Sequence, residues 1–489
     1  MRGKLGVLVG IVLVGIGLVS ACGRQSPSGG ALSVSELLQD PVYDTVVTIY
    51  SKYEHDPEHP AQALRVLLDE CAADPACAAA FPELDQRLYT LVGRLNADPV
   101  VYELPDLETG ERFTVSVTGD RLLNWTFEDA FYLPARRPYP TPYLPLLIDQ
   151  VGRGQIELLL PWLIRDLTGH APGFAHGLYL AVSCQDEFPL ADREIVAAQA
   201  ETHAELGGYV RHAREREICK IWNLPASPPL VSEPIESDIP TLILGGTYDP
   251  ITRPAWVRAS VAQSLSNSHF YEFPDMGHVV SFDSPCAQSM VAAFLNDPTV
   301  APDAGCMANL AGPEFVTPRD VAILPGIYRV QLDVGEAPRS ILVLVVVLAC
   351  VLVFVVEIGY LPIAGILGLV HRSARPAKKE RGSRLANLLA GGMALLNVGF
   401  VVVLGILLST LDTTDPLLIY FGLPAEYAPL LLVPFLTAVL TVVLVVFVVW
   451  AWVRRSWTAP KRILFTVVTG AAVVFAGLMA YWGLLRLPV

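Results

Sequence analysis

Basic side chains are scarce in this 489-residue sequence. It contains 34 Lys and Arg against 48 Asp and Glu, which gives a formal net charge of −14 at pH 7. The basic residues are unevenly placed, because residues 340–489 hold eleven of them against five acidic residues. Residues 1–339 are therefore strongly acidic. Proteins bind nucleic acids through cationic surfaces, so nucleic acid is not an expected partner.

Closely spaced pairs of metal ligands are also missing. The eight cysteines include no tight CxxC pair, and no histidine cluster lies beside them, so we expect no metal site and no cofactor. Six cysteines lie outside the apolar segments and can pair in fifteen ways, among which the sequence does not choose. Closeness in the chain favours three disulfides: Cys71 with Cys77, Cys184 with Cys219, and Cys286 with Cys306.

Apolar residues, in contrast, are abundant. They make up 53% of the chain, and the mean hydropathy of +0.46 is higher than a soluble protein carries. Four apolar runs after Arg339 are each long enough to cross roughly 30 Å of hydrocarbon as a helix. We therefore predict an all-α transmembrane domain over residues 340–489. Its four helices are expected at Ile341–Tyr360, Leu385–Leu411, Pro429–Val453 and Ile463–Leu485.

The loops between these runs predict their orientation. His371–Arg384 and Arg454–Arg462 are strongly basic, whereas Asp412–Tyr427 holds three acidic residues and no Lys or Arg. The positive-inside rule places the two basic loops in the cytoplasm. Four crossings then place residue 339 and the C-terminus outside the cytoplasm.

Polar residues inside the apolar runs are few. Glu357 is ionisable and lies well inside a run, which makes it a functional candidate. Because it lies near the cytoplasmic end of that run, we expect its carboxylate to reach the lipid headgroups. Asn387 and Asn397 are expected to bond neighbouring helices. Without an internal repeat or a broken helix pair, anchoring or assembly is a simpler interpretation than transport.

The N-terminus has the features of an export signal. Arg2 and Lys4 precede a short apolar stretch, and Val19-Ser20-Ala21-Cys22 resembles a lipobox. We predict a signal peptide over residues 1–21, lipidation of Cys22 and a flexible tether over 22–40. An uncleaved membrane anchor is the alternative, and in either case the domain after the tether would be exported. The expected location is a bacterial cell membrane, with residues 23–339 on the extracytoplasmic side.

The exported part changes character at about residue 236. Residues 41–235 are predicted to be mostly helical, with helices over 61–95 and 143–167 and a strand pair over 100–117. Residues 236–325 instead show a buried strand at Thr241–Leu244, a helix at Ala255–Leu265 and a second strand at His269–Phe273.

Asp249 follows the first of these strands and His278 follows the second. The carboxyl ends of parallel strands share one edge of a sheet, where catalytic groups collect. An aspartate bonded to one imidazole nitrogen lets the other nitrogen act as a base toward a serine. The alternative is that Asp249 caps a turn and His278 is an ordinary loop residue.

The runs PTLILGGTYDPITRPAW and FYEFPDMGHVVSF, together with the cysteines at 286 and 306, resemble the C-terminal part of tripeptidyl aminopeptidase-like α/β-hydrolases, relatives of prolyl aminopeptidases. Upstream, LLDECAADPACAAAFPEL, SVTGDRLL and AVSCQDEFP resemble the helical cap of that family. The resemblance implies that Asp249 and His278 are the triad acid and base, and that the three disulfides form as above. It also suggests that Glu187 lies near a pocket for the free amine of a substrate, although Glu187 is as easily a surface residue.

One feature of the family is missing. No serine in the sequence has glycine at both −2 and +2, so the GxSxG nucleophile motif is absent. About 40 residues separate the lipobox from the cap-like helices, too few for the six strands that carry this motif in the family. We therefore predict an α/β-hydrolase fragment, consisting of the cap and the C-terminal strands and helices of the core, followed by the transmembrane domain.

Three interpretations are open. The chain is a degenerate hydrolase that acts as a binding or assembly module, a hydrolase completed by another polypeptide that supplies the nucleophile, or a membrane assembly module with a remnant hydrolase domain. An active form would act on peptides with a free N-terminus or on small esters and amides. A truncated or split reading frame would also give this pattern.

Overall fold

The computed structural model describes six stretches of the chain, which are 58–105, 112–126, 141–160, 175–189, 213–228 and 236–485, with gaps at 260, 283, 311, 332, 334–339, 371–381 and 415–416. It also describes the isolated residues 131, 194, 198, 201–203 and 206. These residues divide into two compact units at Thr317 and Pro318. The predicted signal peptide, the lipidation site Cys22 and the tether lie outside the described residues.

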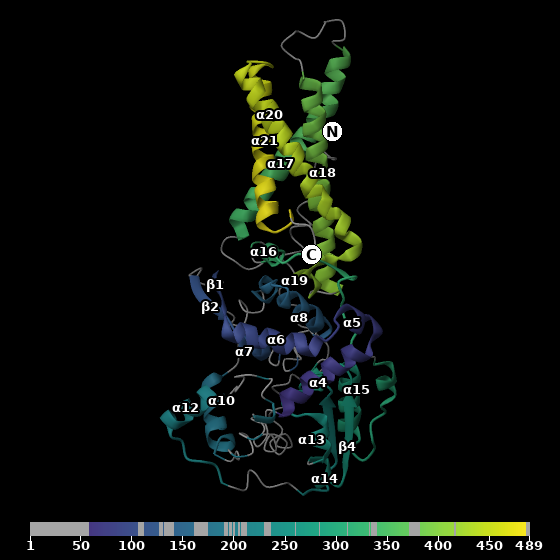
Figure 1. Cartoon of the computed structure of the whole chain (residues 1–489). Coiled ribbons are helices and arrows are strands. Elements are labelled where there is room, and N and C mark those ends of the chain that lie inside the picture. Colours follow the sequence, from purple (N-terminus) through teal and green to yellow (C-terminus); the bar gives the residue numbers. More distant parts are fainter. Residues whose placement is uncertain are drawn as a thin grey trace. The chain divides into compact units, whose positions relative to one another are not determined.

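The first unit begins with three helices that follow the predicted periodicity. They are α4 (Glu58–Ala73), α5 (Pro75–Ala80) and α6 (Leu84–Ala97) (Figure 1). Asp74 separates the first two, because its side chain accepts a hydrogen bond from the backbone N–H of Cys77 and caps α5. The disulfide between Cys71 and Cys77 closes the same corner.

The rest of the helical region includes a small strand pair. β1 (Val100–Pro105) pairs with β2 (Arg112–Val117), as predicted, and the turn between them lies outside the described residues. Asp149 is buried and forms ion pairs with Arg87 and Arg153, which ties α8 to α6. The helices after this strand pair are α7 (Gly119–Trp125), α8 (Leu144–Gly152), α10 (His176–Val182) and α12 (Ala213–Trp222).

The strand-helix-strand segment forms the other part of this unit. β3 (Thr241–Gly246) and β4 (Ser268–Phe273) are parallel neighbours, with Thr241 opposite Ser268 and Gly246 opposite Phe273. The helix expected between them is present as α13 (Pro254–Ala259) and α14 (Val261–Ser264), on either side of residue 260, which lies outside the described residues.

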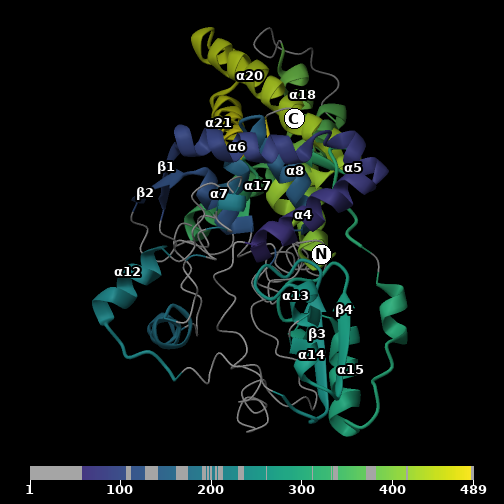
Figure 2. The same cartoon turned by 60° about the horizontal axis from the view of Figure 1, so that its bottom comes forward.

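Helices cover both faces of the β3–β4 pair, and the group is compact in both views (Figures 1 and 2). On one face, Pro254 of α13 lies against Gly245, and Arg258 lies over the ring of Phe270. On the other face, α15 (Pro285–Asn296) is held by the disulfide between Cys286 and Cys306. The buried core there consists of Phe273, Val280, Cys286, Ala287 and Met290.

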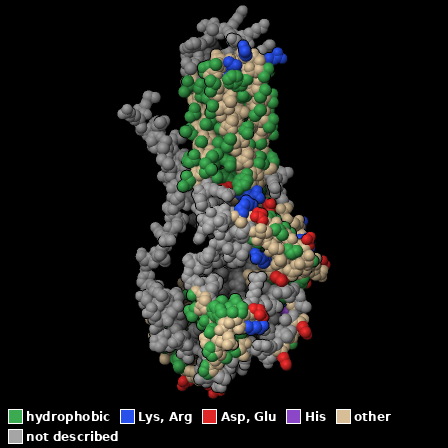
Figure 3. All heavy atoms as spheres, turned by 90° about the vertical axis from the view of Figure 1, so that its left-hand side faces the viewer, with side chains coloured by type: hydrophobic (Ala, Val, Ile, Leu, Met, Phe, Trp, Pro, Cys, Tyr) green, Lys and Arg blue, Asp and Glu red, His purple; other side chains and the backbone are tan. Residues whose placement is uncertain are grey.

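The second unit contains four long helices that match the four predicted apolar runs. They are α17 (Ser340–Val370), α18 (Ser383–Thr414), α20 (Leu432–Val453) and α21 (Ala459–Tyr481). All four are long and apolar enough to cross a membrane. Figure 3 shows hydrophobic side chains along the outside of the helices, with Lys and Arg at their end.

Short segments meet at one end of this helical bundle. β5 (Val321–Ile323), which precedes α17, pairs antiparallel with β6 (Gly422–Pro424), which lies between α18 and α20. Trp482, just after α21, donates its indole N–H to Asp333. The start of α17, the acidic loop and the end of α21 therefore share one end, the arrangement that an even number of crossings requires. β5, which we expected within the hydrolase part, belongs to this unit.

A close backbone approach between the ends of β3 and β4 generates a prediction. A Cβ atom on Gly246 would lie 2.2 Å from the carbonyl oxygen of Gly277. We expect Gly246→Ala to lower the free energy of unfolding by about 2 kcal/mol or more, because neither backbone segment can move away freely. Urea unfolding followed by pulse proteolysis measures this. Gly312→Ala, in open space, is the control; equal stability of the two variants would contradict the close approach.

Candidate active site

The turn after β3 and the loop after β4 are joined along their backbones. Thr247 donates its N–H to the carbonyl of Phe273, and Tyr248 donates to that of Met276. At the neighbouring residue Gly246 the two backbone segments lie so close together that only glycine, which has no side chain, fits. The parallel register of β3 and β4 thus brings the two segments that carry Asp249 and His278 to one edge.

The carboxylate of Asp249 is buried, at 3% exposure, and fully engaged. Its Oδ1 accepts hydrogen bonds from the backbone N–H groups of Ile251 and Thr252, each at 2.8 Å. Its Oδ2 accepts a bond from the hydroxyl of Thr252 at 2.7 Å. These bonds fix the orientation of the carboxylate before any contact with the histidine is considered.

His278 completes the pair. Its Nδ1 lies 2.9 Å from Oδ2 of Asp249, which is hydrogen-bond distance, and its side chain is buried. Its backbone N–H donates to the carbonyl of Phe131 at 3.1 Å. With Nδ1–H held by the carboxylate, Nε2 is the nitrogen that can accept a proton. The predicted contact between Asp249 and His278 is therefore present in the structure.

The charge state of Asp249 suits this role. Burial alone would raise the pKa of its carboxyl, but the facing imidazole of His278 and the bonds from Thr252 lower the pKa below its usual value. Asp249 therefore stays ionised in neutral solution, where it stabilises a protonated imidazole.

Three side chains of helix α4 form hydrogen bonds with the turn that contains Asp249. His59 bonds the carbonyl of Ile251, Gln62 accepts a hydrogen bond from Arg253, and Glu70 accepts one from the hydroxyl of Tyr248. The spacing of these three residues puts them on one face of the helix. Helix α4 thus positions the Asp249 turn although it is far away in the sequence, since Glu70 and Tyr248 are 178 residues apart.

Two acidic residues, Asp275 in the loop before His278 and Glu70 on α4, influence each other's surroundings. Burial, with the nearby charge of Glu70, raises the pKa of Asp275 to about 7. Burial, together with the hydrogen bond to the same Glu70, raises the pKa of Tyr248 well above its usual value. Asp275 adopts φ of 55°, a left-handed conformation that is unusual outside glycine, so the loop before His278 is tightly constrained.

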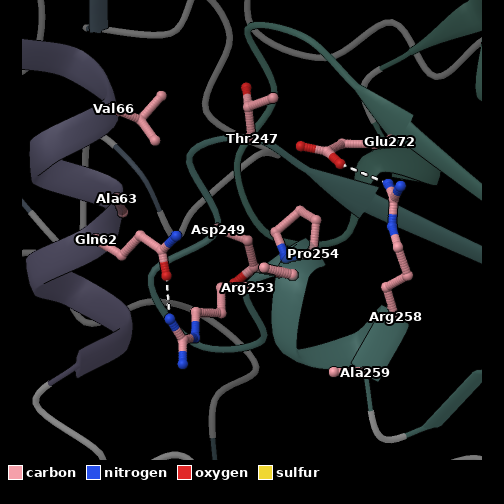
Figure 4. A pocket seen from close by; sticks show the side chains of 11 residues that line it. Gln62, Ala63, Val66, Thr247, Asp249, Arg253, Pro254, Arg258, Ala259 and Glu272 are labelled. Atoms are coloured by element: carbon pink, nitrogen blue, oxygen red, sulfur yellow. Dashed lines mark hydrogen bonds and ion pairs between the residues drawn. The ribbon is translucent and has the colours of Figure 1, made fainter. Parts of the chain in front are cut away.

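A cavity of about 530 Å³ opens between α4 and the end of β3 (Figure 4). Asp249 and Thr247 line it from the turn, and Gln62 and Val66 line it from α4. Arg258, bonded to Glu272, lies on the far wall in the same view. The cavity therefore reaches the acid of the pair, and His278 is not among the residues that line it.

The remaining predicted residues have different outcomes. The three predicted disulfides are confirmed, with Cα–Cα distances of 5.2, 5.1 and 5.7 Å. Glu187 is buried in the π-helical turn Ser183–Glu187, next to the disulfide of Cys184 and Cys219. Helices α10 and α12 lie away from β4 in both views (Figures 1 and 2), and a role of Glu187 in binding a substrate amine stays a prediction.

Several residues of the site were not identified from the sequence. Thr252 could have been, because Asp-x-x-Thr is a signature of a side chain that bonds its own following turn. Phe131 and the α4 residues could not, because only the fold brings them to the site. Among the residues that the structure describes, no group of three or more His, Cys, Asp and Glu could hold a metal ion.

The raised pKa of Asp275 predicts a stability that depends on pH. The unfolded group titrates near 3.8 and the folded one near 7, so the stability present at low pH is lost as pH rises through about 7. We expect a loss of about 2–4 kcal/mol between pH 5 and 8, which Asp275→Asn removes. Urea unfolding across this range measures it, with Asp238→Asn at an exposed position as control. A slope unchanged in Asp275→Asn would contradict the raised pKa.

A comparison with protein-family models matches residues 206–306 to the family described as TAP-like protein. The match spans β3, β4 and α13–α15, and it includes both Asp249 and His278. Searches of curated proteins and of solved structures find no match. Residues 206–306 are therefore a TAP-like α/β-hydrolase region, in a chain that also carries four helices able to cross a membrane.

Proposed function

We propose that this chain is a membrane-anchored, exported hydrolase-like protein of the tripeptidyl aminopeptidase-like family, which holds the acid and base of a catalytic triad but does not turn over substrates by itself. The buried contact of 2.9 Å between Asp249 Oδ2 and His278 Nδ1 carries this proposal. If Asp249 only capped a turn and His278 were an ordinary loop residue, each could bond water or backbone groups, and a buried bond between the two would not be expected.

The absence of a nucleophile motif supports the second half of the proposal. No serine in the sequence has the glycine neighbours of a nucleophile elbow. Triad members act as a unit, so a base without a nucleophile and an oxyanion hole loses most of its catalytic effect. The Asp249–His278 pair would then recognise ligands of the substrate class, namely peptides with a free N-terminus or small esters and amides.

Location at the outer face of a bacterial membrane has independent support. Three disulfides are typical of proteins outside the cytoplasm. The acidic loop 412–427 and the segment before α17 share one end of the bundle, and the basic residues Arg454 and Arg455 follow α20 at its other terminus. With the positive-inside rule, this supports an extracytoplasmic location for residues 23–339, where lipidation of Cys22 would add a second anchor.

A second candidate is a hydrolase that another polypeptide completes. Its support is the exposure of β3, because Thr241–Leu244 are only half-buried, whereas the strands of parallel sheets are normally buried on both faces. In the described part of the chain, β4 is the strand that pairs with β3. A polypeptide that supplies a nucleophile elbow would cover these residues and meet His278.

Labelling with a fluorophosphonate, which reacts with activated serines, tests the proposal. We expect no labelling of the purified full-length chain, because it has a base without a partnered nucleophile. Labelled protein is detected by in-gel fluorescence, with an active serine hydrolase as positive control. Labelling of this chain that is lost in His278→Ala would contradict the proposal.

The same assay separates the two candidates. The chain is co-expressed with each gene adjacent to its own and labelled in membranes. Labelling of a second polypeptide that requires this chain and disappears with His278→Ala would establish completion in trans. His269→Ala, which removes a histidine of β4 outside the Asp249–His278 pair, is the matched control and should leave that labelling unchanged.

A further inference from the structure

The buried carboxylate of Glu357, inside the helical bundle, has no role in the proposed hydrolase site. Glu357 lies on α17 and is 1% exposed, and neither of its carboxylate oxygens has a hydrogen-bond partner. We expected it to reach the lipid headgroups, but this expectation is wrong. Helix α17 continues for thirteen residues beyond it, to Val370, and the side chain is buried among the helices.

A packing contact gives the depth of Glu357 in the bundle. One turn earlier on α17, Phe354 packs edge-to-face against Phe475 of α21, with ring centroids 5.7 Å apart. Because α21 runs in the opposite direction and Glu357 lies three residues after Phe354, Glu357 is about level with residue 472 of α21. Thr469 lies within about one helical turn of that level. It is buried, and its hydroxyl oxygen also lacks a partner.

Two contacts of α20 place a third polar group at the same depth. Its Trp452 donates to the hydroxyl of Thr466 on α21, and its Thr441 lies 3.4 Å from the sulfur of Met393 on α18. At a rise of about 1.5 Å per residue, Met393 is then about level with residue 477 of α21. Asn387, six residues before Met393, is therefore about level with Thr469. Its side-chain carbonyl oxygen is buried without a partner.

These three residues each have a buried side-chain oxygen without a hydrogen-bond partner among the described residues. Helices α17, α18 and α21 contact one another, and the carboxylate of Glu357, the amide oxygen of Asn387 and the hydroxyl oxygen of Thr469 lie within about one helical turn of one level. An ionised carboxylate without hydrogen-bond donors is strongly disfavoured in an apolar interior. A proton on Glu357 removes that charge, and the two neutral polar groups determine how polar its surroundings are.

The charged groups nearest to Glu357 lie on α18 and α21, two of the three other helices of the bundle. Lys461 of α21 is the group whose charge acts on Glu357, and its ammonium donates to the hydroxyl of Ser383 on α18 at 2.5 Å. Arg462 lies over the ring of Trp452, and Arg384 is exposed at the start of α18. Helix α20 has no ionisable side chain. Lys461 thus stands between Glu357 and the end where α18 and α21 begin.

We propose that Glu357, Asn387 and Thr469 form a proton-binding site inside the membrane bundle, with Glu357 as the group that takes up and releases the proton. Lys461 lies on the side of the site from which the proton exchanges. This site is independent of the hydrolase region and would persist if that region had no activity.

Infrared difference spectroscopy of the full chain in lipid bilayers tests this, because it detects the carbonyl band of a protonated carboxyl directly. We expect such a band in the wild type at neutral pH, absent in Glu357→Gln and declining as pH is raised. Asn387→Ala and Thr469→Val should each shift the midpoint of its titration by about one pH unit or more, a readout that a purely structural role would not move. Asn397→Ala, a buried amide further along α18, is the matched control and should leave the midpoint unchanged.

Three results would overturn the proposal. Absence of any Glu357-dependent band between about pH 5 and 9 would mean that the carboxylate is permanently ionised, for example against Lys461. Loss of the band on addition of sodium at constant pH would make this a metal-cation site. Unchanged midpoints in both Asn387→Ala and Thr469→Val would separate these residues from the site. Size-exclusion profiles and Glu357→Asp, which should retain a band, exclude misfolding as the cause of a lost signal.

Discussion

The close approach of two backbone segments, at Gly246 and Gly277, is the constraint on which the candidate site depends. A side chain at Gly246 would overlap the backbone of residues 276–277, and one at Gly277 would overlap the carbonyl of Phe131. The turn after β3 and the loop after β4 can therefore share hydrogen bonds, and Asp249 and His278 meet at 2.9 Å as a result. Helix α4 secures the same turn through Gln62 and Glu70. Asp249 is thus positioned by side chains that lie outside the Asp249–His278 pair.

Hydrophobic runs and residues close together in the sequence were sufficient to predict several elements of the fold. Strand β3, the pairing of Cys286 with Cys306 and the four apolar helices all follow from hydrophobic runs or from neighbouring residues. The meeting of Asp249 and His278 could be predicted because parallel strands bring their carboxyl ends to one edge. The helix predicted after Asp249 is likewise present, as α13 and α14.

Contacts between distant segments could not be predicted in the same way. Phe131, which accepts the backbone N–H of His278, is separated from it by 147 positions and has no distinguishing pattern. Glu357 was misjudged for a related reason: its position in the sequence suggested an end of a span, whereas packing of Phe354 on Phe475 places it deep in the bundle. Burial of a polar group is a property of helix packing, and hydropathy along one helix does not reveal it.

The proposed function depends on the buried contact between Asp249 and His278, in a sequence that has no GxSxG motif. Nuclear magnetic resonance of the full chain with ¹⁵N-labelled histidine tests whether this contact exists. The structure predicts a strongly downfield Nδ1–H resonance from His278 that persists at mildly acidic pH, because the pKa of Asp249 is lowered, and that is lost in Asp249→Asn. A spectrum in which His278 shows no such resonance, or in which Asp249→Asn leaves it unchanged, would contradict the pairing and the function built on it.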